Sequence, residues 1–259
     1  MMRALVREIS DSFAKAVTAA PVSIEIDVAL ARQQHAAYVA GLEWLGATVT
    51  RLEADPRFPD GCFVEDCAVI AGGVALLTRP GAPSRQGEVT EVAAALERLL
   101  ECATMAAPAT LDGGDCLRIG RRIFVGRSAR SNQAGIQRLA DVFMPRGLRV
   151  VAVALPAGVL HLKCVCSSLG DGRVLVAEGV LPAGTFEDLA LVEVPREEAY
   201  AANCVAVGGR ALMAAGFPGA RAAVEAAGLE VRTLEVSETR KADGALTCMS
   251  LLLGPPDGQ

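Results

Sequence analysis

The sequence is poor in aromatic residues and has neither a long apolar run nor a run of basic residues. Aromatic side chains make up 4% of its 259 residues, against 52% hydrophobic residues in all, so the core has to be aliphatic. The net charge of −5 and the lack of a basic run argue against a nucleic-acid partner. The longest apolar stretch, Val150–Leu160, is too short to span a bilayer and contains a proline. No membrane partner is therefore expected.

Export and disulfide bonding are also not expected. The N-terminal segment MMRALVREISDS has charges within its apolar run, unlike a secretory signal, so we expect a cytoplasmic protein. Its eight cysteines should then be thiols, most of them packed as small buried hydrophobes. No pair of cysteines has CxxC spacing and the chain has two histidines, which together make a poor ligand set for structural zinc.

Five of the cysteines return at nearly even intervals along the chain. They are separated by 49, 48, 40 and 44 residues, and they are Cys67, Cys116, Cys164, Cys204 and Cys248. Each of the first four opens a block that reads as a strand, a tight turn containing glycine and a second strand. The fifth block stops after one strand. Self-similarity at this period indicates a chain built from copies of one supersecondary unit.

The hydrophobic period changes from strand to helix after most of these blocks. We expect helices at Val28–Leu45, Gln86–Glu101, Ser131–Phe143 and Pro218–Ala227, with a weaker pattern at Pro182–Leu189. Short β-rich runs follow at Thr48–Leu52, Leu148–Leu155, Leu191–Val194 and Leu229–Val236. The repeated unit is therefore strand, strand, helix, strand.

The two ends of the chain complete one unit. Met1–Arg7 reads as a strand without a partner, and Thr247–Leu253 reads as the missing partner. Pairing them would close the ring and leave no exposed sheet edge at the seam. The sequence predicts a closed α/β propeller with five blades and fivefold pseudosymmetry, with residues 1–259 as a single domain.

Polar residues near the start of each unit should converge on the axis of such a ring. They are Glu65, Asp66, Asp112, Asp115, His161, Lys163, Asn203 and Cys248. Carboxylates that meet on an inward-facing surface suit a planar cation such as guanidinium, which they can hold with paired hydrogen bonds. A thiol beside an imidazole suits nucleophilic catalysis.

Each of these residues also has a purely structural interpretation. Cys248 could be a core thiol, His161 a structural histidine, and the acids partners in salt bridges or turns. Arg85 and Arg130 could be ordinary surface arginines. His35 lies within an amphipathic segment and is expected on a helix surface.

Six segments, in order and spread over nearly the whole chain, resemble the dimethylarginine dimethylaminohydrolases of the guanidino-group modifying pentein superfamily. They are FPDGCFVEDCAVI, LLTRPGAPSR, LDGGDCLRIGRRIFVGRSARSNQAG, LHLK, AANC and KADGALTCMS. The resemblance implies a five-bladed ββαβ propeller. It also implies hydrolysis of Nω-methylated arginines to citrulline and a methylamine, with no metal or organic cofactor. The partner would be a small-molecule substrate, and a homodimer stays open.

The resemblance also implies a role for individual residues. Cys248 resembles the nucleophile, His161 the proton donor and Asp112 the acid that orients the histidine. The remaining residues resemble the substrate-binding set. Asp60, Glu65 and Asp66 would surround the guanidinium, Arg85 and Arg130 would hold the amino-acid end, Ala242 and Asp243 would give backbone contacts, and Val17 would be an apolar residue of a lid loop.

Three other functions compete with this one. Another amidine hydrolase of the superfamily, such as an arginine deiminase, would use nearly the same central residues. A non-catalytic propeller that binds a partner, like the ribosome anti-association factor of similar fold, would need no Cys–His pair. A Cys–His protease would leave the acids at Asp60, Glu65 and Asp66 without a purpose.

Overall fold

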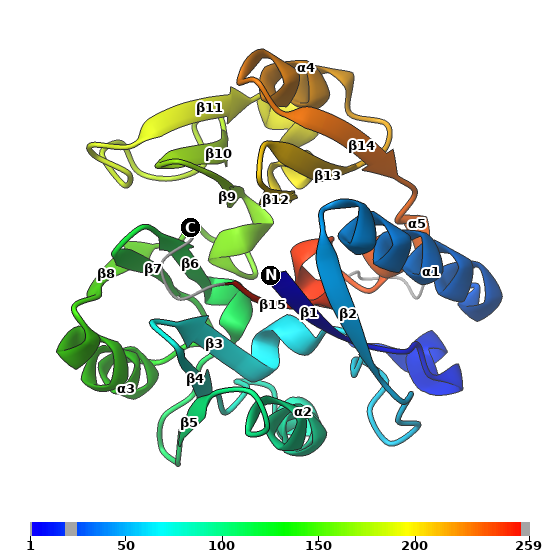
Figure 1. The fold of residues 1–259 in the computed structure, drawn as a ribbon, viewed down its shortest axis with the longest axis vertical. Coiled ribbons are helices and arrows are strands. Elements are labelled where there is room, and N and C mark those ends of the chain that lie inside the picture. The colour runs from blue at the N-terminus through cyan, green and yellow to red at the C-terminus, as the bar shows by residue number, and fades with distance from the viewer. Residues whose placement is uncertain (1, 19–24, 255–259) are drawn as a thin grey trace.

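The computed structural model describes residues 2–18 and 25–254, and these residues form five small sheets arranged around a central axis (Figure 1). Each sheet has three strands. The inner strand pairs antiparallel with the middle strand, and the middle strand pairs parallel with the outer one. The five-bladed α/β propeller predicted from the repeat is thus confirmed.

Four of the blades are continuous along the chain, and their strands are named from the axis outward. They are β3 (Ala68–Ala71), β4 (Val74–Leu77) and β5 (Glu101–Thr104); β6 (Cys116–Ile119), β7 (Arg122–Arg127) and β8 (Arg149–Ala154); β9 (Cys166–Gly170), β10 (Arg173–Ala177) and β11 (Ala190–Val194); and β12 (Val205–Val207), β13 (Arg210–Ala214) and β14 (Glu230–Leu234). The outer strand runs parallel to the middle one, so a crossover connection has to join them.

The fifth blade joins the two ends of the chain. Its inner strand is β15 (Leu251–Leu253), its middle strand is β1 (Met2–Arg7) and its outer strand is β2 (Ala47–Leu52). β15 pairs antiparallel with β1, with Arg3 opposite Leu253 and Leu5 opposite Leu251. The predicted closure of the ring by the terminal strands is confirmed, although Met1 lies outside the described residues.

Helices on the outside of the propeller supply most of the crossovers (Figure 1). They are α1 (Val28–Trp44), α2 (Val89–Leu96), α3 (Gln133–Phe143) and α4 (Pro218–Ala226), with a short α5 (Ser237–Lys241) before the last turn. The Asn132 side chain caps α3 by accepting from the Gly135 N–H at 2.8 Å. Pro218 occupies the first turn of α4, where its missing N–H costs nothing.

Two helix predictions need correction. The helix predicted at Gln86–Glu101 ends at Leu96. It ends there because Glu101–Thr104 forms the outer strand beside β4. Pro182–Leu189 forms turns and no helix. Gly184 and Asp188 there have φ values of 79° and 66°, in the left-handed region, which a right-handed helix cannot contain.

Burial also differs from expectation at His35. Its side chain lies on the covered face of α1 and is 1% exposed, so it is not a surface histidine. All eight cysteines are free thiols, as predicted. The five evenly spaced cysteines do not occupy equivalent positions in the blades, however. Cys116 begins an inner strand, whereas Cys248 lies in the turn before one, so the cysteine spacing marks the period without marking a common site.

A turn of 3-10 helix comes within two residues of every inner strand. These turns are η2 (Val64–Cys67), η4 (Gly113–Asp115), η6 (Leu162–Cys164), η7 (Arg196–Ala202) and η8 (Thr247–Met249). η2 contacts η8 and η4, η4 contacts η6, and η6 contacts η7. The chain therefore turns near the axis five times, and residues far apart in sequence meet there. Over the described ranges, no helix has the length and apolar character needed to cross a membrane.

The seam where the two chain ends pair in the fifth blade is closed by aliphatic packing. Leu5 of β1 is 1% exposed and packs in one cluster with Leu251 and Leu253 of β15 and with Val64 and Cys67 of η2. β1 and β15 are separated by nearly the whole chain, so their pairing carries a large loop-closure entropy cost. The aliphatic contacts offset that cost.

Replacing Leu5 with alanine should therefore destabilise the fold by about 2–5 kcal/mol, the usual range for a fully buried leucine. The measurement is urea unfolding followed by circular dichroism. Leu191→Ala is the matched control, because Leu191 is 50% exposed and its loss should cost at most about 0.5 kcal/mol. Equal midpoints for the two variants would contradict the packing of this seam.

Candidate active site

Nine of the residues predicted to form the site line one pocket at the axis. They are Val17, Asp60, Asp66, Arg85, Arg130, His161, Ala242, Asp243 and Cys248, and they come from every part of the chain. The space in the pocket, counted out to its open mouth, is about 670 Å³. The two other predicted residues, Asp112 and Glu65, lie behind it.

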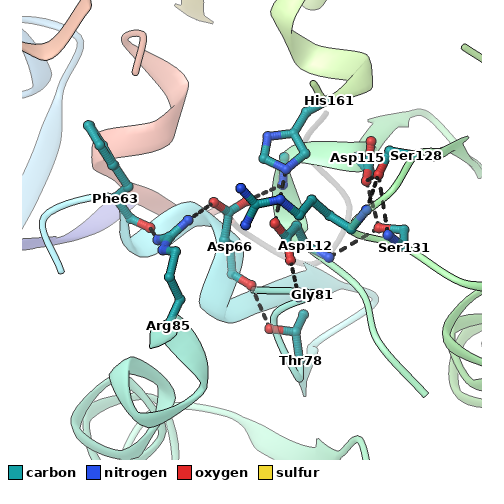
Figure 2. Close-up of polar contacts among 12 residues, drawn as sticks. Phe63, Asp66, Thr78, Gly81, Arg85, Asp112, Asp115, Ser128, Ser131 and His161 are labelled. Carbon is teal, nitrogen blue, oxygen red and sulfur yellow. Dashed lines mark hydrogen bonds and ion pairs between the residues drawn. The ribbon is translucent and has the colours of Figure 1, made fainter. Parts of the chain in front are cut away.

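His161 is held by Asp112 at the back of the pocket (Figure 2). The Nε2 atom of the imidazole is 3.0 Å from Oδ2 of Asp112, and both side chains are buried. The other carboxylate oxygen of Asp112 accepts from the Gly81 N–H at 2.7 Å, and the Asp112 N–H donates to the Ser131 hydroxyl. The acid is thus fixed on both sides and orients the ring, the arrangement predicted for this pair.

His161 is protonated at neutral pH. Burial would lower its pKa, but the neighbouring Asp66 carboxylate and the hydrogen bond with Asp112 outweigh burial and raise the pKa to about 9. The folded-state pKa therefore lies above the ordinary value of 6.5. The stabilisation from this charge is complete below that ordinary value and is lost as the pH rises through about 9.

Asp66 faces the pocket with its carboxylate charged. Its Oδ1 accepts from the Gly114 N–H at 2.8 Å and its Oδ2 pairs with Nη1 of Arg85 at 2.5 Å. Burial would raise its pKa, but the charges of His161 and Arg85 lower it to about 2. Each carboxylate oxygen keeps a lone pair for a further donor. Asp66 can therefore still bind a cation in the pocket.

Two glycines allow His161, Asp66 and η2 to approach this closely. A Cβ atom on Gly114 would lie 2.9 Å from Nδ1 of His161 and 3.0 Å from Oδ1 of Asp66. A Cβ atom on Gly113 would lie 2.0 Å from the Glu65 carbonyl oxygen. The GG pair in the LDGGD motif is thus a requirement of close packing around the imidazole.

Cys248 lies on η8, half-buried, with its side chain lining the pocket. Burial raises the pKa of its thiol well above the ordinary value, and the Glu65 and Asp66 carboxylates raise it further. Cys248 is therefore a neutral thiol in the empty pocket, and a cation bound beside it would favour the thiolate.

Glu65 does not face this pocket, although it was predicted beside the guanidinium. Its carboxylate pairs with Nζ of Lys163 at 2.6 Å and accepts from the Thr247 hydroxyl at 2.8 Å. Asn203 donates to the Thr247 hydroxyl at 2.9 Å and accepts from the Thr247 N–H at 3.0 Å. The three residues Glu65, Lys163 and Thr247 line a second cavity among the inner strands, which shares no lining residue with the first. Glu65 thus supports the turn that carries Cys248.

The two predicted arginines differ in how much of their charge is already paired. The buried guanidinium of Arg85 forms ion pairs with Asp66 and Glu88, donating to the Glu88 carboxylate from both Nε and Nη2. It also donates to the Phe63 carbonyl. Arg130 makes no ion pair with any described residue and is half-exposed. Arg85 therefore holds Asp66 in place, and Arg130 is the guanidinium available for an anion.

Asp60 and Val17, both in the pocket lining, are joined by a hydrogen bond. The Val17 N–H donates to the Asp60 carboxylate at 3.1 Å, and the Val17 side chain is 45% exposed. Burial raises the pKa of Asp60, with Arg85 opposing it. Asp243, which also lines the pocket, has a φ of 55°, a left-handed conformation that Asp tolerates better than most residues.

Four lining residues were missed by the sequence analysis. Phe63, Leu160, Thr18 and Gly244 complete the wall, and the first two add apolar surface beside the charged groups. Phe63 lies against Gly244, where a Cβ atom would be 2.4 Å from the ring. Phe63 stands within the FPDGCFVEDC segment and Leu160 precedes His161, so their proximity to predicted residues was the available signal.

Asp66, Asp112 and His161 place one ligand atom each within 4.8 Å of one another, a spacing that could hold a metal ion. Their atoms are already used among themselves and by Arg85 and Gly114. A metal ion bound here would have to displace the proton of His161 and break the hydrogen bond between Nε2 and Asp112. The cluster fits a proton donor better than a metal site.

The two histidines give a direct test of these charges by NMR titration of their ring C–H signals. His161 should titrate near pH 9, whereas burial lowers the pKa of His35 below its ordinary value. Asp112→Asn should lower the pKa of His161, because it removes a charged acceptor from the ring, and should leave His35 unchanged. A native His161 that titrates at or below the ordinary value would refute the proposed charge state.

Comparisons with known proteins agree with this geometry. The family model described as "N,N dimethylarginine dimethylhydrolase, eukaryotic" matches residues 7–204. The chain is 39% identical over 254 residues to the N(G),N(G)-dimethylarginine dimethylaminohydrolase of Streptomyces coelicolor, covering 97% of this chain and 96% of the relative. It is 37% identical over 227 residues to the enzyme of the same name from Pseudomonas aeruginosa, covering 87% and 89%.

Solved structures show the same relationship. A cysteine-to-serine variant of the Pseudomonas aeruginosa protein in complex with citrulline superposes with a TM-score of 0.93 at 34% identity, covering 98% of this chain and all of that one. The N-terminal domain of ArgZ, a cyanobacterial arginine dihydrolase, has a TM-score of 0.87 at 21% identity over 97% of this chain and 98% of its own, which supports the fold alone. The chain belongs to the dimethylarginine dimethylaminohydrolase family.

Proposed function

We propose that the protein hydrolyses Nω,Nω-dimethyl-L-arginine and Nω-monomethyl-L-arginine to L-citrulline and dimethylamine or methylamine. The observation that carries the proposal is one pocket that contains a thiol, a protonated imidazole and a charged carboxylate. The sequence relatives named dimethylarginine dimethylaminohydrolase, and the citrulline complex of one of them, support the same activity. We further propose that residues 1–259 act as one catalytic domain.

The pocket offers complementary groups to both ends of the substrate. Asp66 would take the guanidinium on the oxygen lone pairs that Arg85 and Gly114 leave available. Arg130, which pairs with no described acid, would take the α-carboxylate. Phe63 and Leu160 would cover the aliphatic stem and the methyl groups. Held in this way, the central guanidinium carbon faces Cys248 in attack geometry.

The first step forms a carbon–sulfur bond. Binding of the cation beside Cys248 stabilises the thiolate, and the thiol proton leaves to solvent. The thiolate adds to the guanidinium carbon, and His161 donates its proton to the methylated nitrogen. The carbon–nitrogen bond then breaks and neutral dimethylamine leaves. The products of this step are a cationic S-alkylthiouronium on Cys248 and a neutral imidazole.

The second step returns the enzyme to its starting state. The neutral His161 takes a proton from a water molecule, and the hydroxide adds to the thiouronium carbon. The carbon–sulfur bond breaks and the sulfur departs as a thiolate that regains a proton from solvent. The new hydroxyl group loses its proton to solvent as the urea carbonyl forms, and citrulline leaves. Asp112 holds Nε2 of the ring throughout, which leaves Nδ1 to exchange protons with the substrate and the water. No step needs a metal or an organic cofactor.

Another amidine hydrolase of the same superfamily, such as an arginine deiminase, stays the alternative. It would use the same thiol, imidazole and acids but prefer an unmethylated guanidinium. The apolar side chains of Phe63 and Leu160 in the pocket wall favour the methylated substrates. The homodimer and the cytoplasmic location expected from the sequence stay predictions.

A substrate panel tests the assignment. Citrulline or its analogue should form faster from dimethylarginine and monomethylarginine than from arginine or agmatine. Cys248→Ser should lower turnover by at least about a thousandfold, because it removes the nucleophile. Cys102→Ser is the matched control, since Cys102 is a half-buried thiol on the outer strand β5, and it should keep turnover within about twofold. Faster turnover of arginine than of its methylated forms would contradict the proposal.

A further inference from the structure

Asp115 is a fully buried carboxylate that does not line the pocket, yet it contacts two segments that do. Figure 2 shows its contacts with Ser128 and Ser131. It is the last residue of η4 and directly precedes the inner strand β6. The hydrogen bonds of its two oxygens go to different parts of the chain. One oxygen holds the loop that carries Arg130, and the other holds the turn that follows His161.

Oδ2 organises the Arg130 loop. It accepts from the hydroxyls of Ser128 and Ser131, the latter at 2.6 Å. The Ser128 oxygen in turn accepts from the backbone N–H of Arg130 at 3.0 Å and of Ser131 at 3.2 Å. Ser131 also accepts from the Asp112 N–H. Ser128 and Ser131 are therefore fixed directly to this carboxylate, and the backbone of Arg130 is fixed to it through the Ser128 hydroxyl.

Oδ1 organises the His161 turn. It accepts from the backbone N–H of Leu162 at 3.1 Å, which fixes the peptide that follows the histidine. The neighbouring strand leaves room for this contact only because residue 126 is glycine. A Cβ atom on Gly126 would lie 2.7 Å from Oδ1 of Asp115 and 3.1 Å from Cβ of Leu162.

From these contacts we propose that Asp115 is a positioning residue that sets the distance between the anion-binding Arg130 and the proton donor His161. The inference rests on the proposed function, in which these two side chains hold opposite ends of one substrate. Asp115 touches no reacting atom. It acts through Ser128 on one side and through Leu162 on the other, so the two arms can be disturbed separately.

The charge pattern makes Asp115 hard to replace. It receives three donors and gives none, and the hydroxyls of Ser128 and Ser131 already accept from backbone N–H groups. An asparagine would point its NH₂ group either at those hydroxyls or at the Leu162 N–H. One of the two arms would lose its acceptor in either orientation.

The test compares three variants in steady-state turnover of dimethylarginine. Ser128→Ala loosens the Arg130 arm and should raise KM by roughly tenfold with kcat within about twofold. Gly126→Ala pushes on Oδ1 and should lower kcat by roughly tenfold with a smaller change in KM. Asp115→Asn should change both. For every variant, kcat is calculated per folded protein, with the folded fraction measured by circular dichroism, so that loss of folded protein cannot imitate a fall in kcat.

Glu198→Gln is the matched control, because the Glu198 carboxylate also accepts from two backbone N–H groups, those of Gly219 and Ala220, but lies outside the pocket. It should leave kcat and KM within about twofold. Native-like kcat and KM in Asp115→Asn would overturn the inference. If Asp115→Asn does not fold, equal effects of Ser128→Ala and Gly126→Ala on kcat and KM would overturn it.

The inference can fail separately from the proposed function. If the native protein forms no citrulline, the NMR signal of the His161 ring still reports on the Oδ1 arm. Gly126→Ala should shift that signal, and Ser128→Ala should leave it nearly unchanged. The reverse pattern, or no shift in either variant, would contradict the role of Asp115 whatever the substrate is.

Discussion

The structure depends on keeping several charged side chains together at the axis of an otherwise aliphatic propeller. Asp66, Asp112, Asp115 and Glu65 are all at least nine-tenths buried, where an unpaired charge would be costly. Each has at least one partner from another blade: Gly114 for Asp66, His161 for Asp112, Leu162 for Asp115, and Lys163 with Thr247 for Glu65. The blades are thus joined at the centre by the same hydrogen bonds that orient the candidate catalytic groups.

This charge arrangement accounts for the chemistry we assign. The acids raise the pKa of His161 to about 9, and burial together with the Glu65 and Asp66 carboxylates keeps the Cys248 thiol neutral. Before substrate binds, the pocket therefore contains an acid and a nucleophile that is not yet activated. A bound guanidinium favours the thiolate of Cys248, because its positive charge lies beside the sulfur. Activation of the thiol is therefore coupled to binding of the cation, and the proton donor is in place before the leaving group departs.

The fold and most of the site could be predicted from the sequence. The features that could not be predicted have physical causes. The repeat period was sufficient for the five blades and their closure by the chain ends. Glu65 and Asp66 are neighbours in a 3-10 turn, where successive side chains point about a third of a turn apart, so adjacency could not show that they face different cavities. Gly113 and Gly114 are needed for contacts with residues about fifty positions away, and local pattern carries no such information.

The central claim is that Cys248 forms a covalent bond to the guanidinium-type carbon and that His161 is needed to release it. His161→Gly should react with S-methyl-L-thiocitrulline, whose thiol leaving group departs with little help from an acid, and then stall because no base activates water. Peptide mass spectrometry should find the adduct on Cys248 and on none of the other seven cysteines. An adduct on a different cysteine, or an unmodified Cys248 after the thiol has been released, would contradict the account.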